Sequence, residues 1–198
     1  MKRLKGFLRQ HLTYRFIRRY QDFKWFITRD VMYYEKLHRR EFFRRAFRAL
    51  SFNGIDGDYV EFGVGSTTFD LAYEESRKVN YFCKLWAFDS FLGLPPKTMP
   101  EDEHPQWKEG AFKTSLQNFL SLCHRIPKSE YCVIPGFYKD VLAGEHASDR
   151  SLPRNISLAF IDCDMYSSAK VVLSFLGTRL KHGMIIAFDD YFCWSSKA

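Results

Sequence analysis

Residues 60–68 read VEFGVGSTT, which is an apolar run with one acid, then Gly-x-Gly, then three hydroxyl residues. A short β-rich run that turns through glycines into a helical stretch indicates the first strand and helix of an α/β domain. Glycine at 63 and 65 allows a tight turn and lets a ligand approach the backbone, which a Cβ would block. The competing interpretation is a plain strand-to-helix turn, because Gly-x-Gly alone is a weak signal.

The same stretch does not fit a dinucleotide site. Thr68 stands where such a site has its third glycine. A carboxylate at Glu61, just before the turn, disfavours a pyrophosphate at the start of the helix. Glu61 suits a cationic or hydroxyl-bearing ligand better, so an NAD-dependent oxidoreductase is disfavoured.

From residue 57 onward, short β-rich runs alternate with helical stretches. This alternation predicts a mostly parallel sheet with helices on both faces, and ligands bound at the carboxyl ends of the strands near the switch in strand order. The predicted strands are residues 58–62, 85–88, 131–134, 156–161 and 184–188, and the predicted helices are residues 68–78, 114–124, 139–142 and 167–180.

An acid stands at the end of the second predicted strand, in Trp86-Ala87-Phe88-Asp89-Ser90-Phe91. A carboxylate at this place can accept both hydroxyl hydrogens of a ribose diol. The alternative is that Asp89 caps a turn, as aspartate often does. Together with the glycine motif, we favour ribose binding.

Acids also end the fourth and fifth predicted strands, at Asp162, Asp189 and Asp190. Carboxylates grouped at one edge of a sheet repel each other unless a cation or a shared proton intervenes. Oxygen ligands are those that Mg²⁺ or Mn²⁺ prefers, so an all-aspartate cluster points to these ions and away from zinc. The alternative is that each aspartate caps the turn that follows its strand.

Five blocks follow one another along the sequence: VEFGVGSTT, AFDSFLGLPP, EGAFKTS, VIPGFYKDVL and IDCDMYSSAKVVLSFLGTRLKHGMIIAFDDY. Together they resemble the macrocin O-methyltransferase (TylF/MycF) family. The resemblance covers about residues 57–192 and implies a Rossmann-like class I methyltransferase fold, S-adenosylmethionine as methyl donor, and Mg²⁺-assisted transfer to a hydroxyl of a sugar, glycan or glycosylated metabolite.

The resemblance also implies roles for single residues. The methionine end of the cofactor would lie near the glycine motif, the ribose at the second strand, and the adenine after the third strand. The ion would lie at the acidic strand ends, with Asp162 also the catalytic residue and Asp164 in support. The implied cofactor-binding residues are Glu61, Gly63, Gly65, Ser66, Asp89, Ser90, Phe91, Gly136 and Phe137, and the implied metal ligands are Asp162, Asp189 and Asp190.

The long polar segment 93–112 contains several prolines and follows the second strand directly. Loops of this length are usually functional lids or mobile surface segments. Beside a cofactor site we favour a lid that excludes water, with Trp107 placed to stack on a sugar ring.

The charge of the chain is unevenly distributed: residues 1–50 carry a balance of +11 and the remainder −4. Apolar residues in the first part recur at helical steps, with a break expected between Thr28 and Tyr34 and a stop at Asn53-Gly54. We therefore divide the chain into a basic amphipathic helical segment, 1–54, and a core, 55–198.

The basic segment has several interpretations. A helical cap on the core or a dimer element comes first, and an anionic membrane surface second. Nucleic acid is disfavoured as a partner, because there is charge but no binding motif. If the core were not catalytic, the protein would be an interaction module whose N-terminus binds a membrane or a protein partner.

The remaining features concern the compartment and the end of the chain. Five unpaired cysteines, no secretory signal and no apolar run of about 20 residues predict a cytoplasmic protein, with attachment to the inner membrane surface left open. Members of the resembled family continue after the DDY block with a helix and an antiparallel strand pair, whereas this chain ends at Ala198. We expect that completion to be missing through truncation, which leaves 184–188 as a sheet edge; a covering partner or a degenerate relative are the alternatives.

Overall fold

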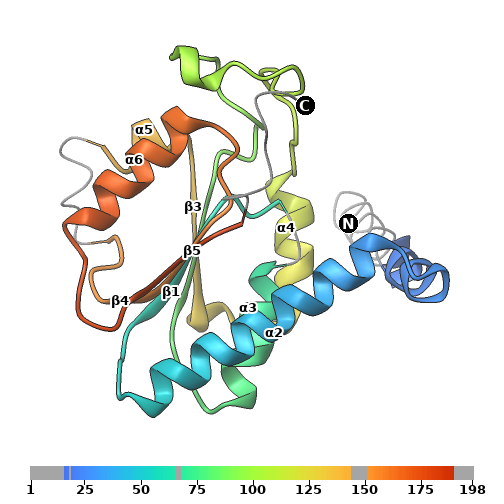
Figure 1. Ribbon diagram of the computed structural model, residues 1–198, viewed down its shortest axis with the longest axis vertical. Helices are drawn as coiled ribbons and strands as arrows, with labels where there is room; N and C mark the ends of the chain where they lie inside the picture. The colour runs from blue at the N-terminus through green and yellow to red at the C-terminus, as the bar shows by residue number, and fades with distance from the viewer. Residues whose placement is uncertain (1–15, 18, 66–67, 144–150, 190–198) are drawn as a thin grey trace, which may run out of the picture.

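The computed structural model describes residues 16–17, 19–65, 68–143 and 151–189 of the 198-residue chain. Its centre is a five-stranded, fully parallel sheet in the order β3-β2-β1-β4-β5 (Figure 1). The switch in strand order lies between β1 and β4. The strands are β1 (Asp58–Phe62), β2 (Leu85–Asp89), β3 (Tyr131–Pro135), β4 (Ile156–Ile161) and β5 (Ile185–Phe188).

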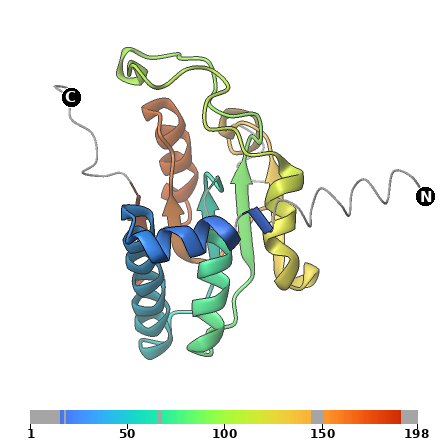
Figure 2. The ribbon, with the colours of Figure 1, turned by 90° about the vertical axis from the view of Figure 1, so that its right-hand side faces the viewer.

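Helices cover both faces of the sheet. One face carries α2, α3 and α4 and the other carries α5 and α6, as Figures 1 and 2 show. The helices are α2 (Val31–Phe52), α3 (Thr68–Lys78), α4 (Leu116–Leu122), α5 (Tyr138–Val141) and α6 (Tyr166–Gly177), with 3-10 turns η1 (Pro100–Asp102), η2 (Cys123–Arg125) and η3 (Lys128–Glu130).

The alternation of side chains along β1 explains the two layers. Tyr59 packs into the core under α2 and α3, while Val60 and Phe62 pack into the core under α6. Both faces of the strand are thus buried, as is typical of parallel sheets, although the strand also carries the buried acid Glu61. β1 is therefore the central strand of the sheet and contributes to the cores on both of its faces.

The second half of α2 belongs to the same core as the sheet. Phe43, Phe47 and Leu50 are completely or almost completely buried, and the Phe43 and Phe47 rings contact Tyr59 of β1. The helix ends as predicted, at Asn53, whose side-chain amide donates to the Ala49 carbonyl, followed by Gly54 with φ of 65°.

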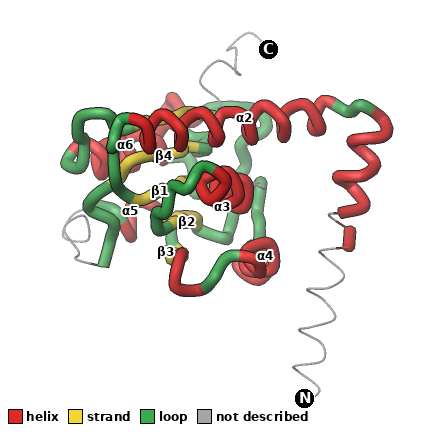
Figure 3. Tube along the Cα trace, turned by 90° about the horizontal axis from the view of Figure 1, so that it is seen from below, coloured by secondary structure: helices red, strands yellow, loops and turns green. Residues whose placement is uncertain are grey.

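The predicted break in the basic segment is also present. A first helical stretch, 19–28, ends at Arg29, which has a positive φ of 52°, and the Asp30 side chain then caps the start of α2. Figure 3 shows that 19–28 turns sharply away from the axis of α2.

The fold predicted from the sequence is confirmed: a Rossmann-like α/β sheet preceded by helices. The five strands and the helices of the core lie within a few residues of their predicted bounds. β5 is an edge strand of the described sheet, as expected. The expectation about an antiparallel strand pair after β5 lies outside the described residues. None of the described helices is both long and apolar enough to cross a membrane.

Candidate functional site

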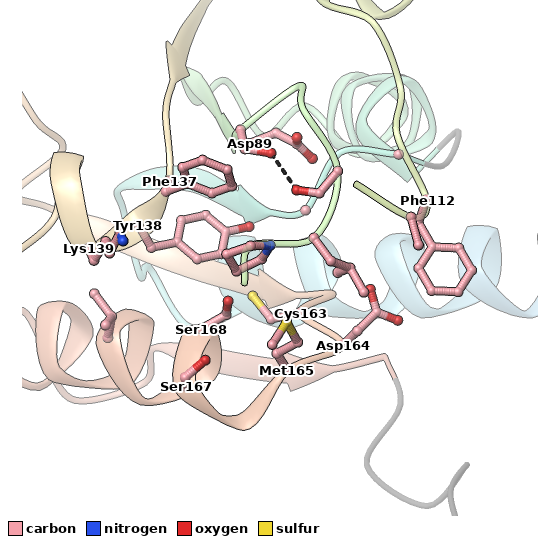
Figure 4. Close-up of a pocket in the computed structure, with 18 of the residues that line it drawn as sticks. Asp89, Phe112, Phe137, Tyr138, Lys139, Cys163, Asp164, Met165, Ser167 and Ser168 are labelled. Carbon is pink, nitrogen blue, oxygen red and sulfur yellow. Dashed lines mark hydrogen bonds between the residues drawn. The ribbon is translucent and has the colours of Figure 1, made fainter. Parts of the chain in front are cut away.

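A cavity of about 570 Å³ opens at the carboxyl ends of the strands, around the switch between β1 and β4. Figure 4 shows Asp89 and Phe137 on one side of it and Cys163, Asp164 and Met165 on the facing side. This is the position where open parallel sheets bind their ligands. Seven of the predicted site residues line it: Gly63, Gly65, Asp89, Ser90, Gly136, Phe137 and Asp162.

Gly63 is required by the close approach of the two central strand ends. Its φ is 88°, and a Cβ at this position would lie 2.0 Å from the carbonyl oxygen of Asp162. Gly65 has room for a side chain instead, because a Cβ there would make an ordinary contact of 3.7 Å with Thr114 Oγ1. Gly63 therefore allows the ends of β1 and β4 to approach each other closely, and Gly65 lines the cavity without a side chain.

The Asp89 carboxylate is fixed by two backbone amides. The Val64 amide donates to Oδ2 at 2.9 Å, and the Phe91 amide donates to Oδ1 at 2.6 Å. Burial raises the pKa of Asp89, and the two hydrogen bonds oppose that shift. A carboxylate oxygen can accept more than one hydrogen bond, so each oxygen retains capacity for a ligand hydroxyl. Asp89 thus caps the turn and also presents its oxygens at the cavity.

Two predicted cofactor-binding residues do not line this cavity. Glu61 is completely buried on the α2 and α3 side of the sheet, where Tyr59 Oη donates to it at 2.5 Å and the Thr68 hydroxyl donates to its other oxygen. Phe91 has a positive φ of 55° and packs against Phe119 in the core. Both side chains pack in the core next to the strand ends, and neither lines the cavity in which a cofactor would bind.

Burial dominates the chemistry of Glu61. It raises the pKa of this carboxyl from 4.5 to about 8, although the hydrogen bonds from Thr68 and Tyr59 act in the opposite direction. Glu61 is therefore a neutral, hydrogen-bonded acid over much of the physiological range. It is not the charged wall of a pocket for a cation.

The third strand supplies the wall on which an adenine is predicted to lie. Gly136 follows β3 with φ of 145°, and a Cβ there would meet Val141 Cγ1 at 2.6 Å. Phe137, Tyr138 and Lys139 continue this wall. The Tyr138 ring and Lys139 were not predicted, although they follow Gly136-Phe137 within the VIPGFYKDVL block.

Two of the three predicted metal-ligand aspartates lie at the ends of neighbouring strands. The register pairs Ile161 of β4 with Phe188 of β5, so Asp162 and Asp189 occupy equivalent places on neighbouring strands. Asp190 and Ser66 lie outside the described residues. Within the described ranges, no group of three or more His, Cys, Asp or Glu side chains is gathered as metal ligands would be.

A guanidinium from the N-terminal helix reaches this acidic edge. Arg39 of α2 donates to Asp189 at 2.5 Å and pairs with Glu35 at 2.7 Å. Burial acts to lower the pKa of Arg39, but the charges of Asp189, Glu35 and Asp162 outweigh it and raise it. Arg39 therefore places a positive charge beside the aspartates that end β4 and β5.

The segment 93–113 forms a roof over the cavity. Backbone hydrogen bonds join Leu94 to Ala111 and to Gly110 at its base. At its far end, the buried Asp102 accepts a hydrogen bond of 2.9 Å from the amide of Ser167 at the start of α6. Leu94, Pro95 and Pro96 line the cavity. The predicted lid is thus a covering segment that is tied down at both ends.

Trp107 does not take the predicted sugar-stacking position. It is buried within the segment, with its ring 4.8 Å from His104, and is not among the cavity-lining residues. The aromatic ring that the segment turns to the cavity is Phe112 (Figure 4). The sequence did not distinguish the two rings, because both lie in the same polar stretch.

Comparison with known proteins agrees with this geometry. The sequence model of the family described as Macrocin-O-methyltransferase (TylF) matches residues 32–198. The chain belongs to this family. A search of curated protein sequences gives no match.

Two solved structures share the fold. "CalS11, Calicheamicin Methyltransferase" superposes with a TM-score of 0.62 and 19% identity, over 79% of this chain and 65% of that chain. "The O-methyltransferase NovP" superposes with a TM-score of 0.63 and 21% identity, over 78% and 65%. The chain therefore spans about two thirds of the length of either.

Several further cavity residues come from one block of the sequence that follows β4. Cys163, Asp164, Met165, Ser167 and Ser168 all line the cavity. They belong to the IDCDMYSS block, which carried part of the family resemblance. The block is thus a wall of the cavity as well as the end of β4.

Proposed function

We propose that this chain is an O-methyltransferase that transfers the methyl group of S-adenosylmethionine to a hydroxyl of a sugar, glycan or glycosylated metabolite, assisted by Mg²⁺. Family membership supports the reaction class. The observation that carries the proposal is Asp89, a carboxylate held by two backbone amides at the edge of a cavity at the strand-order switch. That arrangement suits a ribose diol.

The cavity fits the chemistry of S-adenosylmethionine in three places. Asp89 and Ser90 would bind the ribose, Gly136 and Phe137 would flank the adenine, and the bare backbone at Gly65 would admit the methionine end. When bound, this cofactor supplies an electrophilic methyl group on a sulfonium, which an oxygen nucleophile can attack in line without a covalent enzyme intermediate. The protein therefore has to bind, orient and exclude water.

The acidic edge would serve the acceptor hydroxyl. Asp162 lines the cavity and is our candidate for the catalytic carboxylate that takes the hydroxyl proton. Asp162 and Asp189 would hold the divalent ion, with Asp190 as the third predicted ligand. When bound, such an ion lowers the pKa of a hydroxyl in contact with it. Arg39 pairs with Asp189 beside this position, so its charge would compete with the ion for this carboxylate.

The roof over the cavity supports an acceptor with an apolar or ring-shaped face. Leu94, Pro95, Pro96 and Phe112 present carbon surface to the cavity from the segment 93–113. Sugar rings have an apolar face that packs on such surfaces, while their hydroxyls need polar partners. Thr98, Lys113 and Ser168 are polar residues of the same cavity.

Calorimetric titration with S-adenosylmethionine tests the proposal. Asp89→Ala should weaken binding by about a hundredfold or more, because it removes the ribose acceptors and leaves two backbone amides without partners. Asp140→Ala is the matched control, since this aspartate is exposed, lies beside the Phe137 wall and does not line the cavity. Its affinity should equal that of the wild type.

The proposal fails if the folded wild type shows no heat with millimolar S-adenosylmethionine, or if Asp89→Ala binds as well as Asp140→Ala. In the first case the core would be a non-catalytic support for the N-terminal segment. Loss of turnover in chelator, with cofactor affinity intact, would support the metal part separately.

A further inference from the structure

The first helical segment presents an apolar stripe to solvent. Phe16, Tyr20, Phe23 and Ile27 follow each other at steps of four, three and four, so they lie on one side of a helix. Their exposed fractions are 67, 68, 61 and 61%. Four large apolar side chains exposed in a row are unusual on a soluble protein and mark an interaction surface.

Two side chains of this segment that lie off the stripe contact α2. Asp22, which falls off the apolar stripe, pairs with Lys36 of α2 at 2.8 Å. The Phe26 and Tyr33 rings make an edge contact at 5.5 Å, which fixes the bend between the segment and α2. The segment is therefore fixed against α2 by side chains off the stripe, while the stripe itself stays exposed.

The sequence around the stripe is strongly basic. Residues 1–21 contain seven Lys and Arg and no Asp or Glu. Within the helical segment, Arg19 and Lys24 are both exposed beside the stripe. The apolar spacing continues N-terminally in the sequence through Leu4, Phe7, Leu8 and Leu12.

We propose that the apolar stripe Phe16–Tyr20–Phe23–Ile27 binds the surface of an anionic lipid bilayer, with the flanking Arg and Lys residues contacting the lipid phosphates. A helix with aromatic and aliphatic residues on one side and basic residues beside them inserts its apolar side between headgroups. Anionic lipid attracts nearby Lys and Arg, and this attraction weakens with salt. Binding of the stripe to a bilayer does not depend on the proposed methyl transfer.

Charge favours the bilayer over a second copy of the chain as the occupant. Two copies joined through this stripe would bring together two segments that each carry a balance of +11 over residues 1–50. Like charges so close destabilise an interface. An anionic bilayer supplies the opposite charge and an apolar layer at the same time.

Vesicle sedimentation of the full chain tests the proposal. The protein should sediment with phosphatidylcholine vesicles that contain about 30% phosphatidylserine, weakly with phosphatidylcholine alone, and much less when salt is raised from about 0.1 M to about 0.5 M. Phe23→Gln with Ile27→Gln should lower the partition coefficient at least about tenfold, because two apolar side chains no longer enter the bilayer.

The matched control is Phe52→Gln with Phe82→Gln, which also removes two large apolar side chains from the surface, 91 and 78% exposed, but off the stripe. It should bind vesicles as the wild type does. Circular dichroism should give the same helix content for all three proteins, since every substituted side chain is exposed.

Three results would overturn the proposal: no sedimentation of the wild type with anionic vesicles at low salt, equal binding of the stripe variant, or equal loss in the control variant. Sedimentation velocity tests whether a second copy of the chain, rather than a bilayer, covers the stripe. A wild-type dimer that the stripe variant dissociates, without binding to lipid, would assign the stripe to a second copy.

Discussion

Glu61 and Asp89 lie near the ends of neighbouring strands, yet their surroundings give the two acids opposite roles. Glu61 faces the apolar core under α2 and α3, and burial raises its pKa to about 8. Asp89 faces the cavity and is held by the Val64 and Phe91 amides. Their depth in the sheet decides this, because Glu61 lies within β1 opposite Ala87, whereas Asp89 is the last residue of β2, two residues closer to the cavity.

The protonated state of Glu61 should appear in the pH dependence of stability. Between its ordinary pKa of 4.5 and about 8, the native protein keeps a proton that the unfolded chain has released. The free energy of unfolding should therefore fall as pH rises through this range, by up to about 1.4 kcal/mol per pH unit. Glu61→Gln keeps one acceptor and one donor but does not titrate, so it should lack this loss.

Urea denaturation of both proteins at about pH 5.5 and about pH 7.5 measures the effect. The wild type should lose stability relative to Glu61→Gln at the higher pH. A difference that stays constant, or that changes in favour of the wild type, would show that Glu61 is ionised in the native protein.

At the scale of elements, the roof segment and α6 depend on each other. The residue before α6, Met165, has no side chain that can cap a helix, and Asp102 supplies the missing carboxylate from 65 residues away. Burial acts to raise the pKa of Asp102, but the hydrogen bonds from Ser167 and Thr98 outweigh it and lower it. One side chain thus caps a helix that lines the cavity and fixes the roof above it.

Asp102→Ala should detach the roof from α6. Loss of the cap should lower the free energy of unfolding by about 1–2 kcal/mol, and amide hydrogen exchange should become faster around Thr98 and Ser167. Glu101→Ala is the control, because this neighbouring acid of η1 is exposed. Equal exchange in the two variants would contradict the role of Asp102.

At the scale of the molecule, Arg39 links the N-terminal helix to the last strand of the sheet. Its partner, Asp189, is 150 residues away, and their side chains are only 22 and 12% exposed. The second half of α2 is anchored in the core through Phe43 and Phe47, so Arg39 is held at a fixed place on a rigid helix. The proposed metal position is therefore built partly from the N-terminal segment.

Arg39→Gln should change the balance of charge at the acidic edge. Without the guanidinium, Asp162 and Asp189 repel each other in metal-free buffer, so the thermal midpoint should fall and should be restored by Mn²⁺. Mn²⁺ should also bind about tenfold more tightly, because no cation competes for Asp189. Titration followed by electron paramagnetic resonance of free Mn²⁺ measures this.

Arg45→Gln provides the control, since this arginine of the same helix is 79% exposed and pairs with Glu41, away from the strand ends. It should leave Mn²⁺ affinity unchanged. Weaker Mn²⁺ binding by Arg39→Gln, or no binding by any of the proteins, would argue against the aspartate pair as a cation site.

The sequence alone determined the order and type of the elements, because apolar runs, glycines and caps act locally. The strand at Asp58–Phe62, the stop at Asn53-Gly54 and the turn at Gly63 all follow from neighbours in the chain. The carboxyl ends of parallel strands meet at one edge, so the grouping of Asp89 with Asp162 at one cavity was also predictable.

Only the tertiary structure decided which side chains face the cavity and which partners they have. The Arg39–Asp189 pair and the Asp102 cap on α6 join parts of the chain that no sequence spacing relates. Helical spacing predicted the stripe of the first helical segment, but only packing left it exposed. Glu61 and Trp107 were predicted to reach a ligand, and packing buried both. A strand end or a loop fixes where a residue lies, but the orientation of its side chain depends on what packs against it.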